Sequence, residues 1–504
     1  MNSPSLLGTP AGTVPEHEPG YFADLGLDRI VDAVAAHDPA IVPLFRSRAP
    51  TVPVARYRQD LCRALRRDGD LVAGLRRFGA AMAEMRAARS NAERLRLRPE
   101  CDAWALDGAR RYLAAVAGLR ETLAVVADPP AALSDLRAHL DTLIDSPEHR
   151  ETAHDAADVA AQLAGVEYTV RIKKSDVRVG RYQGEPDYGA EVAAVFERFR
   201  VDGGARRAEA APVRPGLDGV EAAILTDVTA LFPDAFRALA RFRERHAGDD
   251  DPVLARVDLE IRWYLGCLDF IARLEAAGVP FTVPAIADGT VLDAHGTVDL
   301  ALAADLVRRG LPVVGNDLRL GADERVLVIT GPNHGGKTAL ARAFGQIHHL
   351  AALGLPVPGT DVTIGLFDEL FTQFERPESA DDRRGRLEAD IEGMRAILTA
   401  ATGRSVVVMN ETFASTSVED GARLGAAVVG RLVATGARCA YVTFVDEIAH
   451  LGDGVVSMTA DVPVEPSART FRVRRGRPQG LAHAAALARR HGLDAEALRR
   501  RIVS

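Results

Sequence analysis

Apolar residues recur at three- and four-residue intervals through much of the first half of the chain. The pattern runs from residue 21 to about 165 in long segments rich in Ala, Leu and Arg, and it returns over 219–278. This spacing places the apolar side chains on one face of an α-helix. We therefore predict a mostly helical region over 21–290.

The helical pattern is interrupted at several places. Residues 166–183 alternate in twos, which predicts a small β ribbon. Segments rich in Pro and Gly predict a flexible tail over 1–20 and a linker over 201–218. Beyond residue 280, short β-branched runs alternate with helical segments, so we expect an α/β domain over 291–504.

The composition is that of an ordinary globular protein. The chain has 504 residues, of which 47% are hydrophobic and 26% are charged. We find no apolar run of membrane-spanning length and no secretion signal at the N-terminus, so we expect a cytoplasmic protein without a membrane segment. The four cysteines lie far apart without a metal-binding spacing, which predicts reduced, buried thiols.

Positive charge is concentrated locally, although the net charge is −8. Residues 51–120 carry fifteen arginines against eight acidic residues, and two of the chain's three lysines, Lys173 and Lys174, lie in the predicted ribbon. Two interpretations stay open. These residues form either a surface that binds nucleic-acid phosphates or the solvated face of arginine-rich helices.

The third lysine lies in the most specific motif of the chain. Residues 326–340 read VLVITGPNHGGKTAL, in which a β-branched run leads into a GxxxxGK[ST] loop and then a helical segment. Such a loop surrounds phosphates with backbone N–H groups, while its lysine contacts the β and γ phosphates and its hydroxyl ligates Mg²⁺. We therefore predict that ATP and Mg²⁺ bind to Gly331, Pro332, Asn333, His334, Gly335, Gly336, Lys337 and Thr338.

A second strand supplies polar groups suited to hydrolysis. Residues 405–409 form a β-branched run that ends in Asn410 and Glu411. Phosphoryl transfer needs a group that holds Mg²⁺ and a group that orients water, usually at the end of another strand. We predict Asn410 as a metal-site residue together with Thr338, and Glu411 with Lys337 as catalytic residues.

These motifs resemble the ATPase domain of the MutS family of DNA mismatch-repair proteins. TGPNHGGKTA resembles the family's TGPNMGGKST, FDELFTQF over 367–374 resembles DRIFTR, and NETFASTSVEDG over 410–421 resembles DEIGRGTSTYDG. The ending RGRPQGLAHAAALARRHGLDAEAL is similar to the family's closing helix region. The resemblance implies an ABC-type P-loop ATPase over 291–504, preceded by core and lever helices, in a DNA-binding homodimer.

The sequence also departs from the family pattern. The family's signature Ser-Thr falls on Leu387 and Glu388, its Walker B aspartate on Asn410, and the histidine of its Thr-His pair on Phe444. There is also no room before residue 21 for the family's mismatch-reading domain. We therefore expect slow ATP hydrolysis and no mismatch reading by that domain.

Two functions fit these observations. One is an ATPase in DNA repair or recombination control that binds duplex or branched DNA without sequence specificity, through the arginines of 51–120. The other is a nucleotide-dependent dimerising module that engages a protein partner and not DNA. Salt-dependent retention on DNA distinguishes them.

Overall fold

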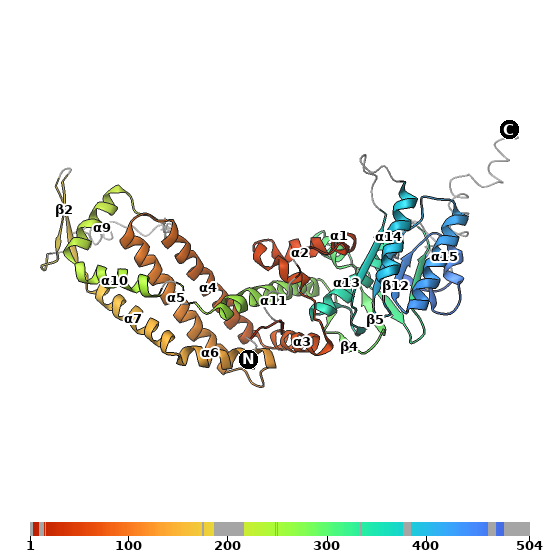
Figure 1. Ribbon diagram of the computed structural model, residues 1–504, viewed down its shortest axis with the longest axis horizontal. Coiled ribbons are helices and arrows are strands. Elements are labelled where there is room, and N and C mark those ends of the chain that lie inside the picture. The colour runs from red at the N-terminus through yellow and green to blue at the C-terminus, as the bar shows by residue number, and fades with distance from the viewer. Residues whose placement is uncertain are drawn as a thin grey trace, which may run out of the picture. The chain divides into compact units, whose positions relative to one another are not determined.

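The computed structural model is a mixed α/β protein that is mostly helical (Figure 1). Its residues form two compact units. Unit 1 comprises Met1–Gly69, Asp128–Ser134 and Leu259–Ser504, and unit 2 comprises Asp70–Ala127 and Asp135–Asp258. The structure describes residues 4–9, 15, 17–173, 176–185, 216–246, 248, 250–332, 335–375, 385–461 and 470–477. Within these ranges, no helix has the length and apolar character needed to cross a membrane.

Unit 1 contains a six-stranded sheet that is parallel except at one edge. Its order is β10 (Leu370–Phe374), β11 (Val406–Asn410), β12 (Arg438–Val442), β7 (Val326–Thr330), β13 (Val455–Ala460) and β14 (Val473–Arg475). The first five strands pair in parallel, and β14 pairs antiparallel with β13. Every residue of β7 and β12 is buried, as expected for central strands with both faces covered.

Helices cover both faces of this sheet. The helices α14 (Arg386–Ala400) and α15 (Val418–Thr435) pack on a face formed by alternate residues of the strands, among them Val328, Met409 and Tyr441. The helix α13 (Lys337–Leu353) directly follows β7 and contacts β11 and β12 from the other face (Figure 1). The carboxyl ends of the five parallel strands therefore share one edge, at which α13 begins.

Smaller elements complete unit 1. A four-stranded sheet has the order β4 (Ala285–Ala287), β9 (Val362–Gly365), β5 (Leu292–Thr297) and β6 (Asn316–Leu320), and β3 (Phe281–Thr282) pairs with β8 (Val357–Pro358). The helices are α1 (Tyr21–Leu25), α2 (Leu27–Ala35), α3 (Val52–Arg67), α12 (Leu300–Arg308) and the part of α11 (Pro252–Ala276) that follows residue 258, together with the 3-10 segments Pro39–Arg46 and Asp446–His450.

The start of the chain is packed into unit 1, so the prediction of a flexible tail over 1–20 is wrong for residues 4–9. The side chains of Leu6 and Leu7 are 2% and 1% exposed. The buried carboxylate of Glu260 accepts hydrogen bonds from Ser5 Oγ at 2.8 Å and from the backbone N–H of Leu6 at 2.6 Å. Arg58 Nε donates to the carbonyl of Leu7 at 2.8 Å. The Leu6–Leu7 pair supplies the apolar surface that outweighs the surrounding proline and glycine.

The helical region also divides differently from the single domain predicted over 21–290. Residues 21–69 and 259–290 belong to unit 1, together with the α/β part of the chain. One reason is the packing of α1 against α13, where the Phe22 ring lies edge-on to the His349 ring at 5.2 Å between centroids. The Tyr21 hydroxyl lies 3.3 Å from His349 Nδ1. Helical periodicity alone does not reveal which partner a helix face covers.

Two neighbouring histidines of α13 are buried and neutral. Burial, with a smaller contribution from Arg48, lowers the pKa of His349 to about 3. Burial likewise holds the pKa of His348 well below its usual value of 6.5. His348 Nδ1 lies 2.6 Å from the carbonyl of Phe344, which requires the proton to be on this nitrogen.

Unit 2 is formed mostly by long helices. Its helices are α4 (Gly69–Arg94), α5 (Arg98–Ala124), α6 (Ala131–Asp145), α7 (Pro147–Ala164), α9 (Gly219–Leu231) and α10 (Pro233–His246), of which α4 and α6 begin in unit 1. Buried Leu106, Val159 and Phe242 join α5, α7 and α10 in one core cluster. The hairpin of β1 (Tyr168–Lys173) and β2 (Asp176–Arg181) is antiparallel and lies within the predicted ribbon range.

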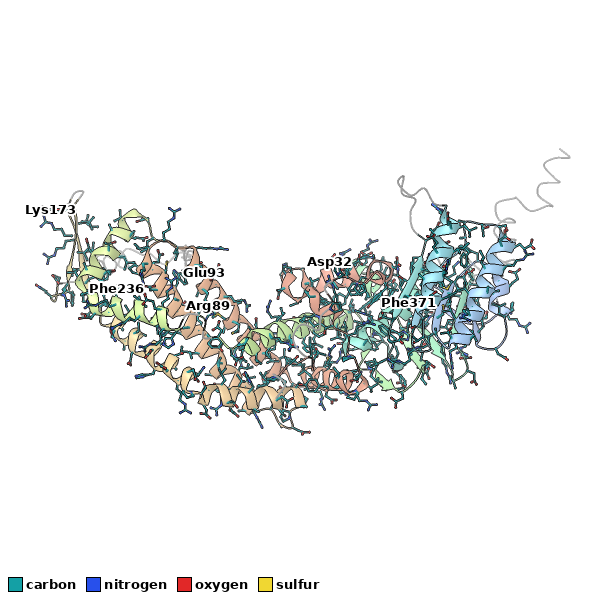
Figure 2. All side chains as sticks on the ribbon, viewed as in Figure 1. Asp32, Arg89, Glu93, Lys173, Phe236 and Phe371 are labelled. Atoms are coloured by element: carbon teal, nitrogen blue, oxygen red, sulfur yellow. The ribbon has the colours of Figure 1, made fainter. Side chains whose placement is uncertain are left out.

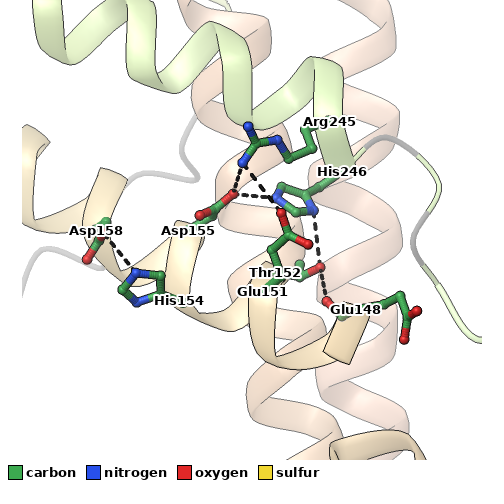
Figure 3. Close-up of polar contacts among 8 residues, drawn as sticks. All are labelled: Glu148, Glu151, Thr152, His154, Asp155, Asp158, Arg245 and His246. Atoms are coloured by element: carbon green, nitrogen blue, oxygen red, sulfur yellow. Dashed lines mark hydrogen bonds and ion pairs between the residues drawn. The ribbon is translucent and has the colours of Figure 1, made fainter. Parts of the chain in front are cut away.

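A polar cluster links α7 to the end of α10 (Figure 3). His246 Nε2 lies 2.9 Å from Asp155 Oδ2, and His246 Nδ1 lies 3.1 Å from Thr152 Oγ1. The Thr152 hydroxyl donates its proton to the carbonyl of Glu148 at 2.9 Å, so it accepts from His246. Hydrogen bonds from His246 and Arg245 hold the pKa of Asp155 below its usual value. The cluster satisfies the polar groups that this helix contact buries.

The buried histidines predict that unit 1 loses stability in mild acid. An unfolded histidine takes up a proton near pH 6.5, whereas His349 with a folded-state pKa of about 3 does not. The contribution of neutral His349 to the free energy of unfolding is complete above pH 6.5 and is lost as the pH falls toward the folded-state pKa. Between about pH 7.5 and about pH 5.5, the free energy of unfolding should fall by about 1.4 kcal/mol for each such histidine. His349→Leu should reduce this pH dependence in urea unfolding, and the exposed control His154→Gln should leave it unchanged.

Candidate functional site

The loop between β7 and α13 requires its glycines. Gly331 has φ 119° and Gly336 has φ 90°, backbone conformations that L-residues with side chains rarely adopt. A Cβ on Gly335 would lie 2.9 Å from Ala460 Cβ and 3.0 Å from the carbonyl of Pro332. The loop therefore passes directly against the end of β13. Of the predicted phosphate-binding residues, Asn333 and His334 lie outside the described residues.

Lys337 is the first residue of α13, and only 4% of it is exposed. Its Nζ donates to the carbonyl of Gly331 at 2.6 Å and lies 4.3 Å from the centroid of the Phe444 ring. Burial lowers the pKa of Lys337, and the carboxylates of Glu411 and Asp446 partly oppose that shift. A poorly solvated cation thus lies at a helix N-terminus, where the backbone N–H groups also attract anions.

Thr338 and Asn410 lie together although they are 72 positions apart in the sequence. The Thr338 hydroxyl donates to Asn410 Oδ1 at 3.0 Å. The two oxygens come from the loop after β7 and from the end of β11. In the part of the chain that the structure describes, no group of three His, Cys, Asp or Glu side chains could hold a metal ion. Mg²⁺ often uses only one or two protein oxygens when phosphates supply further ligands, so this oxygen pair fits such a site.

Glu411 follows β11 directly in a strained backbone conformation. Its φ is 55°, and the φ of Phe413 is 66°. The backbone N–H of Glu411 donates to the carbonyl of Val442 at 2.9 Å, which fixes this residue at the end of β12. Non-glycine residues with positive φ cost free energy and often occur at functional sites. The structure therefore brings the four predicted residues Lys337, Thr338, Asn410 and Glu411 to one edge of the sheet.

The segment after Glu411 is held by residues that sequence reasoning missed. Asp390 of α14 accepts hydrogen bonds from the backbone N–H of Phe413 at 3.0 Å and from Gln373 Nε2 at 3.0 Å. The Tyr441 hydroxyl donates to the carbonyl of Thr412 at 3.1 Å. In the sequence, Asp390 is one of several acidic residues in a short segment, and no spacing marks it as the partner of Phe413 and Gln373.

The middle of α13 is tied to two other helices through Gln346, which is fully buried. Gln346 Nε2 donates to the carbonyl of Leu25 at 2.7 Å and to Asp299 Oδ1 at 2.9 Å. Its Oε1 accepts from the backbone N–H of Leu300 at 2.7 Å. Burial raises the pKa of Asp299 despite these hydrogen bonds. The helix that carries Lys337 is thereby fixed against α1 and α12.

The family comparison covers this site. Residues 327–474 match the family model for MutS domain V. Over these residues the chain is similar to MutS domain V. The predicted resemblance to the MutS family is confirmed over these residues, which include most of β7, all of α13 and β11, and Glu411.

Curated relatives of the MutS family match parts of the chain. An endonuclease MutS2 from Gemmatimonas aurantiaca is 31% identical over 199 residues, which is 39% of this chain and 24% of the relative. A DNA mismatch repair protein MutS from Erythrobacter litoralis is 32% identical over 240 residues, 47% of this chain and 25% of the relative. An endonuclease MutS2 from Latilactobacillus sakei is 28% identical over 263 residues, 51% of this chain and 32% of the relative. The chain thus spans about a quarter to a third of these relatives.

The hydrogen bonds of Asp390 predict a stability effect close to Glu411. Asp390→Ala would leave the backbone N–H of Phe413 and the amide of Gln373 without this partner, at a cost of about 1–3 kcal/mol in the free energy of unfolding. Hydrogen exchange at the Phe413 amide should accelerate. Glu388→Ala on the exposed surface of the same helix is the control and should change both quantities little. Equal exchange rates in the two variants would contradict the contact.

Proposed function

We propose that the protein binds ATP with Mg²⁺ through the loop after β7 and hydrolyses it slowly, with a P-loop domain of the ABC type. The observation that carries the proposal is the convergence of Lys337, Thr338, Asn410 and Glu411 at the carboxyl edge of a parallel sheet. Glycines that tolerate no Cβ and a buried lysine at a helix N-terminus are the parts that phosphate binding needs.

Each residue has a separate role in this proposal. The backbone N–H groups of the loop bind phosphate oxygens, and the Lys337 ammonium neutralises phosphate charge. Thr338 and Asn410 contribute oxygens to the Mg²⁺ site, and bound Mg²⁺ would neutralise further phosphate charge. Glu411 orients the attacking water and accepts its proton, since its carboxylate is the acidic group that directly follows β11.

We expect slow ATP hydrolysis because several residues of this site differ from those at the matching positions of the MutS family. Asn410 brings no negative charge to the metal, and Leu387 and Glu388 replace two hydroxyl side chains. Phe444 replaces a histidine and cannot donate a hydrogen bond. Losing one such stabilising contact costs about 10²-fold in rate.

We also propose that the protein acts as a homodimer, as the resemblance to the MutS family implies. Two nucleotide sites that close between subunits would make hydrolysis depend on protein concentration. Sedimentation with and without nucleotide measures this property directly.

The proposal predicts different outcomes for two substitutions at the site. Lys337→Ala removes a charge-assisted contact to the phosphates and should weaken ATP binding at least about tenfold in calorimetry. Glu411→Gln keeps the shape of the side chain without its charge, so it should bind ATP normally and lose about 10²-fold or more in steady-state hydrolysis. Unchanged ATP affinity in Lys337→Ala would refute the nucleotide site, and unchanged hydrolysis in Glu411→Gln would refute the role of that carboxylate.

The arginines of 51–120 are less available for DNA than the sequence suggested. Arg58 is fully buried and donates to backbone carbonyls, which excludes it from contact with DNA. At least seven others form ion pairs with carboxylates, namely Arg63, Arg66, Arg86, Arg89, Arg98, Arg111 and Arg120. Arg86 pairs with the buried Asp258, whereas the pairs of Arg63, Arg98, Arg111 and Arg120 lie at the surface, as the solvated-face interpretation expects.

The hairpin of unit 2 offers a better surface for nucleic-acid phosphates. Arg171 pairs with Arg178 in the register, and Lys173 lies two positions after Arg171, so the three side chains share one face of the hairpin. Figure 2 shows Lys173 on this hairpin. The side chains of Arg171 and Arg178 are 71% and 81% exposed. Their ion-pair partners are Glu185 and Asp176, whose side chains are 25% and 65% exposed. Ion pairs of such exposed arginines contribute little free energy. Lys174 lies outside the described residues.

We propose that this face binds the phosphate backbone of duplex or branched DNA without sequence specificity. Cations on an exposed two-stranded ribbon reach phosphates but carry no arrangement of groups for reading base edges. Binding of this kind would serve a protein of DNA repair or recombination control, and one of the relatives is named a DNA mismatch repair protein.

The salt dependence of DNA binding tests whether this face of the hairpin contacts DNA. A triple variant with Arg171→Gln, Lys173→Gln and Arg178→Gln should bind DNA more weakly, and the slope of log affinity against log salt should shrink by about 2 to 3. Arg111→Gln is the control for loss of a positive charge outside the hairpin, because Arg111 lies on α5 and pairs with two carboxylates, Glu84 and Asp107. Equal slopes in the triple variant and the wild type would exclude the hairpin as the DNA contact.

A protein partner is the second candidate, and the other face of the hairpin favours it. Tyr168, Val170 and Ile172 are 45%, 38% and 72% exposed on that face. Exposed apolar side chains on a strand are typical of interaction surfaces. If the wild type shows no retention on DNA at low salt, this second function replaces the first.

A further inference from the structure

The ammonium of Lys337 contacts an aromatic ring that has no place in the usual phosphate-binding loop. Its Nζ lies 4.3 Å from the centroid of Phe444. A cation within about 6 Å of a ring centroid is attracted by the ring's quadrupole, most strongly when the cation is poorly solvated. Lys337 is buried, so this condition is met.

The backbone holds Phe444 in this position. Thr443, the preceding residue, is buried and donates its backbone N–H to the carbonyl of Ile329 in β7 at 3.1 Å. The Thr443 hydroxyl oxygen accepts from the backbone N–H of Val445 at 3.1 Å. Phe444 thus follows β12 in a fixed turn next to the start of the loop, with its side chain half exposed.

The contact with Phe444 reduces the number of N–H groups that Lys337 can donate to a phosphate. A lysine ammonium has three N–H donors. One of them is bonded to the carbonyl of Gly331. The side that faces the ring cannot donate to phosphate while the ring is there, because a phosphate oxygen would have to occupy the same space. The ammonium therefore retains donor capacity for about one phosphate group.

We propose that Phe444 determines the nucleotide specificity of this site: by covering one side of the Lys337 ammonium, it leaves ATP little advantage over ADP. A phosphate-loop lysine normally contacts both the β and γ phosphates. With one side of the ammonium covered, its remaining N–H group donates to the β phosphate, which ADP and ATP share. The γ phosphate of ATP therefore gains little binding free energy from Lys337. The proposal rests on the nucleotide binding proposed above.

The first test detects the contact without any nucleotide. The chain has only three lysines, so lysine-selective isotope labelling gives three sets of side-chain NMR signals. The Lys337 methylene signals next to the ring should be shifted upfield by the ring current, and Phe444→Leu should abolish that shift. Leu451→Ala, which alters an exposed apolar residue of the same unit, is the control. Unmoved Lys337 signals in Phe444→Leu would overturn the inference and leave the ATP-binding proposal intact.

The second test measures specificity. Calorimetry with Mg²⁺ compares ADP with the non-hydrolysable ATP analogue AMP-PNP in the wild type, in Phe444→Leu and in Leu451→Ala. We expect the two affinities of the wild type to agree within about threefold, and Phe444→Leu to favour AMP-PNP by about tenfold, since a freed ammonium gains a charge-assisted contact. A wild type that already prefers AMP-PNP tenfold, or an unchanged ratio in Phe444→Leu, would overturn the specificity role. A wild type that binds neither nucleotide would overturn the proposed function itself.

Discussion

Nearly complete burial of α13 is the constraint on which unit 1 depends. Most residues of this helix are buried, including Lys337, Gln346, His348 and His349. A buried polar group without a partner costs about 1–3 kcal/mol, so the side chains and the end of the helix need partners inside the protein. Other elements of unit 1 supply partners for Lys337, Gln346 and His349. His348 bonds to the carbonyl of Phe344 in α13 itself, and its Nε2 has no hydrogen-bond partner among the described residues. At the C-terminal end, Arg58 donates to the carbonyl of Leu353.

This constraint connects the predicted phosphate site with the surrounding fold. At its start, α13 holds Lys337 against Gly331 and Phe444, and it holds Thr338 against Asn410. Further along, Gln346 fixes the helix to α1 and α12. The loop can then present its backbone N–H groups without reorganising, which is the main advantage of a preorganised electrostatic site. The hydrogen bonds of Asp390 fix the segment after Glu411 in the same way.

The sequence predicted the parts of this site that depend on local spacing. The GxxxxGK[ST] pattern located the loop between β7 and α13, and the β-branched run before Asn410 located the end of β11. The alternation over 166–183 located the hairpin, and the isolated cysteines are free and buried as predicted.

Contacts between distant segments could not be predicted from the sequence. Three such contacts join residues that have no regular spacing in the sequence. They are Lys337 with Phe444, Gln346 with Asp299, and Leu6 with Glu260. Composition was insufficient in two cases for the same reason. Prolines and glycines around Leu6 suggested a flexible tail. The arginines of 51–120 left both a phosphate-binding surface and a solvated face open, because their carboxylate partners elsewhere in the chain were not known.

The central claim is that the carboxyl edge of the parallel sheet binds ATP through Lys337 and Thr338. A crystal or cryo-electron microscopy structure of the full chain with AMP-PNP and Mg²⁺ tests it most directly. We predict a phosphate oxygen within hydrogen-bonding distance of Lys337 Nζ, at about 2.7–3.2 Å, and Mg²⁺ bound to the Thr338 hydroxyl oxygen at about 2.1 Å. A nucleotide bound elsewhere, or no bound nucleotide at saturating concentration, would contradict the account.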